Sequence, residues 1–126
     1  MKRLIIDLDD TITLSAADGY ANAQPNLPLI AALAHYHSRG FEIVIHTSRN
    51  MRTFEGNIGK INAHTLPVIL AWLARHQVPY DEVYVGKPWC GNDGFYVDDK
   101  AIRPSEFLRY DLAGIHALLA AEKAGG

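Results

Sequence analysis

Short runs of aliphatic residues alternate along the chain with longer amphipathic stretches. The short runs are rich in Ile, Val and Leu, and each ends in polar residues, as buried strands of a parallel sheet do. The pattern predicts four strands, at residues 4–6, 41–45, 83–85 and 95–97.

Three of the longer stretches have helical periodicity. Residues 27–38 place apolar side chains on one face, and Gly40 follows as a stop signal. Residues 63–76 form a second predicted helix, with Pro67 in its first turn, where proline is tolerated. A third helix is predicted from residue 105 to about 123, and residues 10–26 and 50–62 are expected to be loops.

Strands that alternate with helices favour a parallel sheet with right-handed crossovers. We therefore expect an α/β fold: a single Rossmann-like three-layer domain over residues 1–126, with a central parallel sheet and minimal or no cap. The four predicted strands run into the polar clusters DLDDT, HTSRN, GKP and VDD. Ligands of open α/β sheets bind beyond the carboxyl ends of the strands, so all four clusters are expected at one edge.

Composition narrows the choice of partners and compartment. The chain has 126 residues, 48% of them hydrophobic, and a formal net charge of −2, so it has no basic excess with which to bind nucleic acid. Cys90 is the single cysteine, which excludes an internal disulfide and favours a reducing cytoplasm. The apolar run near the N-terminus is too short for a signal peptide, and no membrane partner is expected.

Carboxylates dominate the predicted site. Asp7, Asp9 and one or both of Asp98 and Asp99 would meet at the sheet edge, and such a cluster of like charges needs a cation. All-oxygen ligation suits Mg²⁺. With Lys87 at the same edge, the group is typical of a site where a carboxylate attacks a phosphoryl group.

The spacing within DLDD suggests roles for its acids. Asp7, at the strand end, is predicted to be the nucleophile and a metal ligand. Asp9 returns to the same side of an extended chain and is predicted to be the acid/base group. Thr11 is expected to fix the following loop, next to the substrate.

The cluster after the second predicted strand offers hydrogen-bond donors. Thr47 is predicted to donate its hydroxyl to a phosphate oxygen, with the backbone N–H groups of Ser48 and Arg49 behind it. Arg49, Asn50 and Arg52 are further candidates for substrate binding. The alternative interpretation is a capping pair at Thr47 and Ser48, followed by a solvated loop.

These motifs resemble the four ordered motifs of the haloacid dehalogenase (HAD) superfamily of phosphotransferases. They are DLDDT at residues 7–11, then Thr47, then Lys87, then Asp98-Asp99. The resemblance implies that Asp7 is the nucleophile and binds Mg²⁺. It also implies metal ligation by the Asp9 backbone carbonyl and by Asp98, with Asp99 acting directly or through water.

Two longer strings, HTSRNMRTFEGNIGKINAHTLP and YDEVYVGKPWCGNDGFYVDDKAIRP, further resemble the small capsule-biosynthesis phosphatases of that superfamily. This implies a sugar phosphate or a phosphorylated saccharide as substrate. Neither usual cap position has room for a folded insert, so the site is expected to be open. The 50–62 loop or a neighbouring subunit of a homo-oligomer would cover it.

Other functions remain open from the sequence. A nucleotidase or polynucleotide end phosphatase is the nearest enzyme alternative. A receiver-like phosphoacceptor would need its acceptor Asp after the third strand, where Val85-Gly86 stands instead. A phospho-sugar-binding protein without activity is the remaining alternative.

Overall fold

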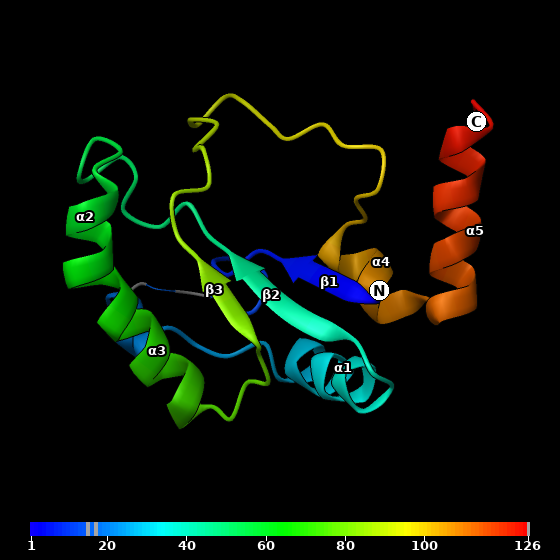
Figure 1. Ribbon diagram of the computed structural model, residues 1–126, viewed down its shortest axis with the longest axis horizontal. Helices are drawn as coiled ribbons and strands as arrows, with labels where there is room; N and C mark the ends of the chain where they lie inside the picture. Colours follow the sequence, from blue (N-terminus) through cyan, green and yellow to red (C-terminus); the bar gives the residue numbers. More distant parts are fainter. Residues whose placement is uncertain (15, 17, 126) are drawn as a thin grey trace. The chain divides into compact units, whose positions relative to one another are not determined.

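The computed structural model describes residues 1–14, 16 and 18–125 (Figure 1). The chain divides into two compact units, Met1–Trp89 and Cys90–Gly126. The first unit holds the sheet and the helices around it, and the second holds two helices at the C-terminal end of the chain.

The first unit is built on a three-stranded parallel sheet. Its strands are β1 (Arg3–Ile6), β2 (Glu42–His46) and β3 (Glu82–Tyr84), in the order β1-β2-β3. The register pairs Ile6 with Ile45, and His46 with Tyr84, so the strands end at one edge. Figure 1 shows the three arrows pointing the same way. The first three predicted strands are confirmed, and the fold is a small Rossmann-like α/β fold.

The fourth predicted strand is wrong. Residues 95–97 are in no strand of the structure, and Phe95 and Val97 are exposed. Their aromatic and β-branched composition suits a strand, but a strand forms only where a neighbouring strand pairs with it. The prediction rested on composition alone, and in the described sheet no strand pairs with these residues.

Helix α1 (Leu27–Ser38) has the predicted bounds. Asn26 caps it by accepting a hydrogen bond from the Leu29 N–H at 3.4 Å, and Pro28 occupies the first turn. Leu29, Leu33 and the other buried side chains of this helix face the sheet, where α1 packs on β2 (Figure 1).

The second predicted helix starts earlier than expected. Helical structure runs from α2 (Ile58–Lys60) through a π-helical turn (Ile61–Thr65) into α3 (Leu66–Arg75). Asn57 caps the start by accepting from the Lys60 N–H at 3.1 Å, a signal hidden in an Asn- and Gly-rich stretch. Pro67 is therefore interior to this helical run, and the wide π turn before it accommodates the missing N–H.

The last predicted helix is two helices, α4 (Pro104–Arg109) and α5 (Leu112–Lys123). Asp111 separates them because its side chain accepts from the Gly114 N–H at 2.9 Å and caps α5. Among the described residues, no helix is long and apolar enough to cross a membrane.

The loop between β1 and α1 is held against α3. It contains a short 3-10 turn (Tyr20–Asn22) and a bridge between Thr13 and Pro25. The indole N–H of buried Trp72 donates to the Ala23 carbonyl at 2.9 Å. This hydrogen bond lies in the core of the first unit. It anchors the C-terminal part of a loop that begins at the predicted catalytic acids.

Candidate active site

The chain turns sharply where β1 ends. Leu8 is buried in the core, while Asp7 and Asp9 on either side of it are only partly buried. The backbone N–H groups of residues 11–13 all point at the Leu8 carbonyl, at 2.9–3.3 Å, and Asp10 takes a left-handed φ of 62°. This tight turn holds Asp7 and Asp9 at the end of β1.

The Asp7 carboxylate lies between a hydroxyl and an ammonium group. Thr11 donates its hydroxyl to Oδ2 at 3.2 Å, and the Lys87 Nζ lies 3.5 Å from Oδ1. Lys87 is fixed at its backbone, where its N–H donates to the Thr47 carbonyl at 3.1 Å. The residue before it, Gly86, has φ 85°, and a Cβ there would meet Ile58. Asp7 is thus contacted by Thr11 from its own turn and by Lys87 from the segment after β3.

Asp9 is held by a buried arginine. The Arg49 Nε donates to Oδ2 at 3.0 Å and its Nη2 donates to Oδ1 at 2.7 Å, a bidentate pair. The Thr13 hydroxyl contacts Oδ1 at 3.4 Å. The Arg49 side chain is 1% exposed, against 27% for Asp9. The carboxylate of Asp9 therefore reaches solvent while its orientation is set from inside.

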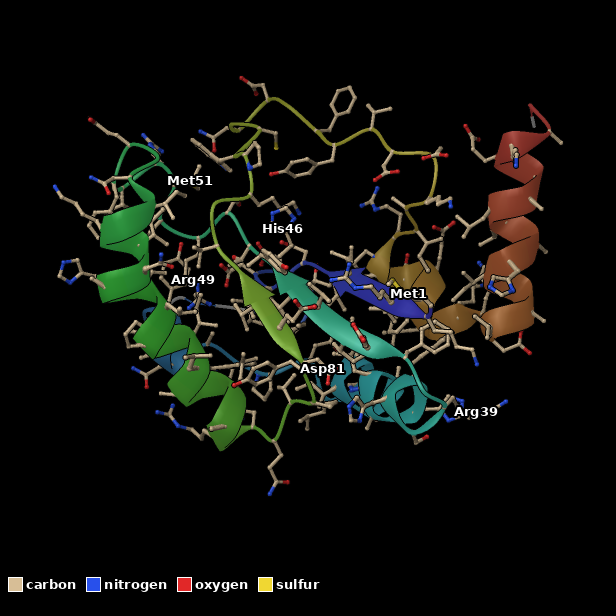
Figure 2. All side chains as sticks on the ribbon, viewed as in Figure 1. Met1, Arg39, His46, Arg49, Met51 and Asp81 are labelled. Carbon is tan, nitrogen blue, oxygen red and sulfur yellow. The ribbon has the colours of Figure 1, made fainter. Side chains whose placement is uncertain are left out.

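A loop residue covers the other face of the guanidinium. The centroid of the Tyr20 ring lies 4.2 Å from the Arg49 Cζ, a cation–π contact. The Arg75 side chain donates to the Ala21 carbonyl at 2.8 Å and so holds the Tyr20 turn on α3. Arg49 Nη1 is buried without a hydrogen-bond partner in the described structure. Figure 2 shows Arg49 beside the helical run that carries α3.

Thr47 follows β2 directly and is buried. Its backbone N–H donates to the Tyr84 carbonyl at 2.9 Å, and its hydroxyl accepts from the Arg49 N–H at 3.1 Å. Next to it, His46 is labelled at the end of β2 in Figure 2. Burial, and then the positive charge of Lys87, lower the pKa of His46, so that its imidazole favours the neutral form.

The remaining residues of the 48–52 stretch have different surroundings. Ser48 is half-buried, and the side-chain amide oxygen Oδ1 of Asn50 accepts from the Thr65 hydroxyl at 2.7 Å, which ties the loop to the helix. Arg52 is exposed, and its Cζ lies 5.7 Å from the Trp89 ring centroid. Arg52 and Trp89 thus bring a cation and an aromatic ring together at the surface. Trp89 is two residues beyond Lys87 in the sequence.

Asp98 and Asp99 belong to the second unit. The Asp98 carboxylate accepts from the Lys100 N–H at 3.0 Å, and this bond, together with one from Asp99, lowers the pKa of Asp98. Over residues 1–14, 16 and 18–125, no group of three or more His, Cys, Asp or Glu side chains is close enough to hold a metal ion. That these two acids join Asp7 in a metal site stays a prediction.

Two residues near the site were missed by the sequence reasoning, namely Tyr20 and Thr13. Thr13 lies four residues after Asp9 in a turn, a spacing that could have suggested its contact. Tyr20 gave no local signal, because its contact with Arg49 depends on how the loop folds over α3.

Comparison with known proteins finds a solved structure that is similar to this chain in both sequence and fold. A crystal structure of a structural-genomics target from Vibrio cholerae matches with 61% sequence identity and a TM-score of 0.95. The match covers 97% of this chain and 99% of the other. A chain of the Pnkp1/Rnl/Hen1 complex shares the fold at 23% identity and a TM-score of 0.50, over 86% of this chain and 34% of that one.

No family model matches the chain, and no curated protein matches it. The likeness to the Vibrio cholerae protein extends over nearly the full length of both chains. This chain belongs to the same protein family as that Vibrio cholerae protein.

Proposed function

We propose that the protein is a Mg²⁺-dependent phosphomonoester hydrolase of the haloacid dehalogenase superfamily. It acts through an aspartyl-phosphate on Asp7, and its substrate is a sugar phosphate or phosphorylated saccharide of capsule polysaccharide biosynthesis. One observation carries the proposal: the Asp7 carboxylate lies between the Thr11 hydroxyl and the Lys87 ammonium at the carboxyl edge of a parallel sheet. Asp9, held by Arg49, lies two residues further along.

In the first half of the reaction, an Asp7 oxygen attacks phosphorus and the bond to the leaving oxygen breaks. Asp9, protonated at this stage, gives its proton to that leaving oxygen. Lys87 lies next to Asp7, so its ammonium is placed to neutralise phosphoryl oxygens in the transition state. The products are a free hydroxyl compound and phosphorylated Asp7.

In the second half, water attacks the same phosphorus and the bond to Asp7 breaks. Asp9, now a carboxylate, takes the proton of that water, so that inorganic phosphate leaves and both acids return to their starting states. The bidentate contact with Arg49 fixes the orientation of the Asp9 side chain beside Asp7.

The oxygen donors of this edge suit Mg²⁺. The carboxylate of Asp7 and the backbone carbonyl of Asp9 would hold it, with Asp98 and Asp99 as the further ligands that the family resemblance implies. When bound, the ion would supply positive charge to the phosphoryl oxygens. The side chain of Asp9 is occupied by Arg49, which leaves its backbone carbonyl for the metal.

The residues around the acids support the proposed substrate class. The partly exposed carboxylates and the surface pair of Arg52 and Trp89 suit a ligand larger than a phosphate. Aromatic rings stack on apolar sugar faces, and an arginine donates to hydroxyls or a second anion.

A phosphatase screen with Mg²⁺ tests this proposal. It would compare sugar phosphates, phosphorylated glycans, nucleoside monophosphates and 3′- or 5′-phosphorylated oligonucleotides. We expect the highest kcat/KM on a phosphorylated saccharide. A preference for nucleotides or for strand ends would contradict the proposed substrate and favour the nucleotidase or end-phosphatase alternative.

A further inference from the structure

The outer edge of β1 is open. In the described sheet β1 pairs with β2 alone, so the backbone N–H and C=O groups on its other side have no strand beside them. Ile5, in the middle of this strand, is 61% exposed. An exposed edge of a parallel sheet is a template for another strand.

A segment whose composition suits pairing with this edge lies elsewhere in the sequence, at residues 95–97. Phe95 and Val97 are 78% and 87% exposed, and neighbouring apolar side chains with this exposure mark interaction sites. The turn before them depends on glycine. Gly91 has φ 79°, and a Cβ on Gly94 would collide with the Cys90 carbonyl oxygen. This turn is therefore a specific conformation that the sequence encodes.

The second unit has little core of its own. Within its described residues, the buried hydrophobic side chains are Phe107 and Ile115. Chains of this size rarely fold on so small a core without a metal, a disulfide or a partner. Cys90 is the only cysteine in the sequence, so no disulfide can form within the chain.

We propose that residues 95–97 of a second copy of this chain pair with the open edge of β1, and that two copies exchange these segments symmetrically. Each copy carries both the open edge and the exposed segment, so one two-fold axis satisfies both. Pairing Val97 with Ile6 brings the ends of the two strands level. The same register puts Asp93 opposite Lys2, which gives an attractive charge pair at the start of the strands.

The exchange has a consequence for the site. Asp98 and Asp99 follow the exchanged strand directly, so each copy delivers these acids to the Asp7 edge of the other. This consequence rests on the proposed function, whereas the strand exchange itself does not. The active enzyme is then a dimer whose two sites are each built from both copies.

Disulfide trapping tests the exchange without any assay of activity. In the proposed register, Tyr96 of one copy lies opposite Ile5 of the other. Neighbouring strands are about 4.8 Å apart, within the reach of a disulfide. The variant carrying Ile5→Cys, Tyr96→Cys and Cys90→Ser should form a covalent dimer on oxidation, seen on a non-reducing gel. A bond within one chain, or no bond, would overturn the proposal.

Light scattering provides an independent measurement with a matched control. The wild type should have the mass of a dimer, and Val97→Lys should have that of a monomer, because a charge enters the paired strand. Leu27→Lys alters another exposed aliphatic residue, at the start of α1, and should remain a dimer. A monomeric wild type, or a dimer that survives Val97→Lys, would refute the exchange.

Complementation tests the shared site. Asp7→Asn and Asp98→Asn chains, each inactive alone, are co-expressed with different tags. Random pairing makes about half of the dimers mixed, each with one intact site, so about a quarter of the wild-type activity should return. If covalent dimers form but no activity returns, the shared site is wrong while the strand exchange stands.

Discussion

Arg49 holds both carboxylate oxygens of Asp9, with its Nε 3.0 Å from Oδ2 and its Nη2 2.7 Å from Oδ1. The guanidinium is almost wholly buried and lies against the Tyr20 ring, so its position is fixed from two sides. The sequence suggested Arg49 as a substrate ligand. The contacts point instead to a positioning residue that acts through Asp9.

Arg49→Lys separates these two roles. A lysine keeps the charge but cannot make the bidentate contact, so Asp9 loses its orientation. We expect kcat on an aryl phosphate to fall by about 10- to 100-fold with little change in KM, because acid/base catalysis contributes about 10²- to 10⁴-fold and a misoriented Asp9 loses only part of it. A rise in KM at constant kcat would show that Arg49 binds substrate directly.

The backbone conformation of Gly86 positions the next residue, Lys87, beside Asp7. Its φ is 85°, and a Cβ would lie 2.6 Å from the Ile58 Cδ1. Gly86→Ala should lower the melting temperature, through the left-handed φ and the collision, and should reduce kcat by displacing Lys87.

Gly40→Ala is the matched control for that substitution. Gly40 has φ 89°, nearly the same, but nothing lies within 4 Å of its Cβ position. Gly40→Ala should lower the free energy of unfolding by about 1–2 kcal/mol through backbone strain alone and leave kcat unchanged. Equal effects of the two substitutions on stability and activity would contradict the role assigned to Gly86.

Arg52 is expected to act in substrate recognition. It is exposed and near the Trp89 ring, so a substrate larger than a phosphate would reach it. Arg52→Ala should raise KM for a phosphorylated saccharide about tenfold and leave KM for a small aryl phosphate unchanged. Lys60→Ala removes another exposed positive charge of the same region and serves as the control. Equal changes with both substrates would exclude a recognition role.

The sequence predicted the elements whose signals are local. The strands up to residue 85 and α1 were found because runs of aliphatic residues and the stop at Gly40 are local signals. The start of α2 was missed because its cap, Asn57, lies among other polar residues. The strand at 95–97 was predicted from composition, but a strand depends on a partner that composition does not specify.

The same distinction applies to the site. Asp7 and Lys87 were expected at one edge because parallel strands end together, and their 3.5 Å separation fits that expectation. The contact of Tyr20 with Arg49 joins residues 29 positions apart through a loop anchored on α3. No periodicity or motif predicts such a contact, because it depends on tertiary packing.

Metal removal tests the predicted cofactor. Dialysis against EDTA should abolish hydrolysis, and Mg²⁺ should restore it, because the proposed mechanism needs a small hard cation beside the phosphoryl oxygens. Ca²⁺ should bind without supporting turnover, since its larger radius and looser geometry do not position the phosphoryl group. Unchanged activity in EDTA after exhaustive dialysis would exclude a metal-dependent mechanism.

The most direct test of the account is hydrolysis of an aryl phosphate by Asp7→Asn, with Asp10→Asn as the control. Asp10 is the neighbouring acid, and asparagine tolerates its left-handed φ of 62°. We predict that Asp7→Asn keeps the wild-type fold and loses at least about a thousandfold in kcat, whereas Asp10→Asn stays within about threefold of wild type. Activity of Asp7→Asn within about tenfold of the wild type would contradict nucleophilic catalysis by Asp7.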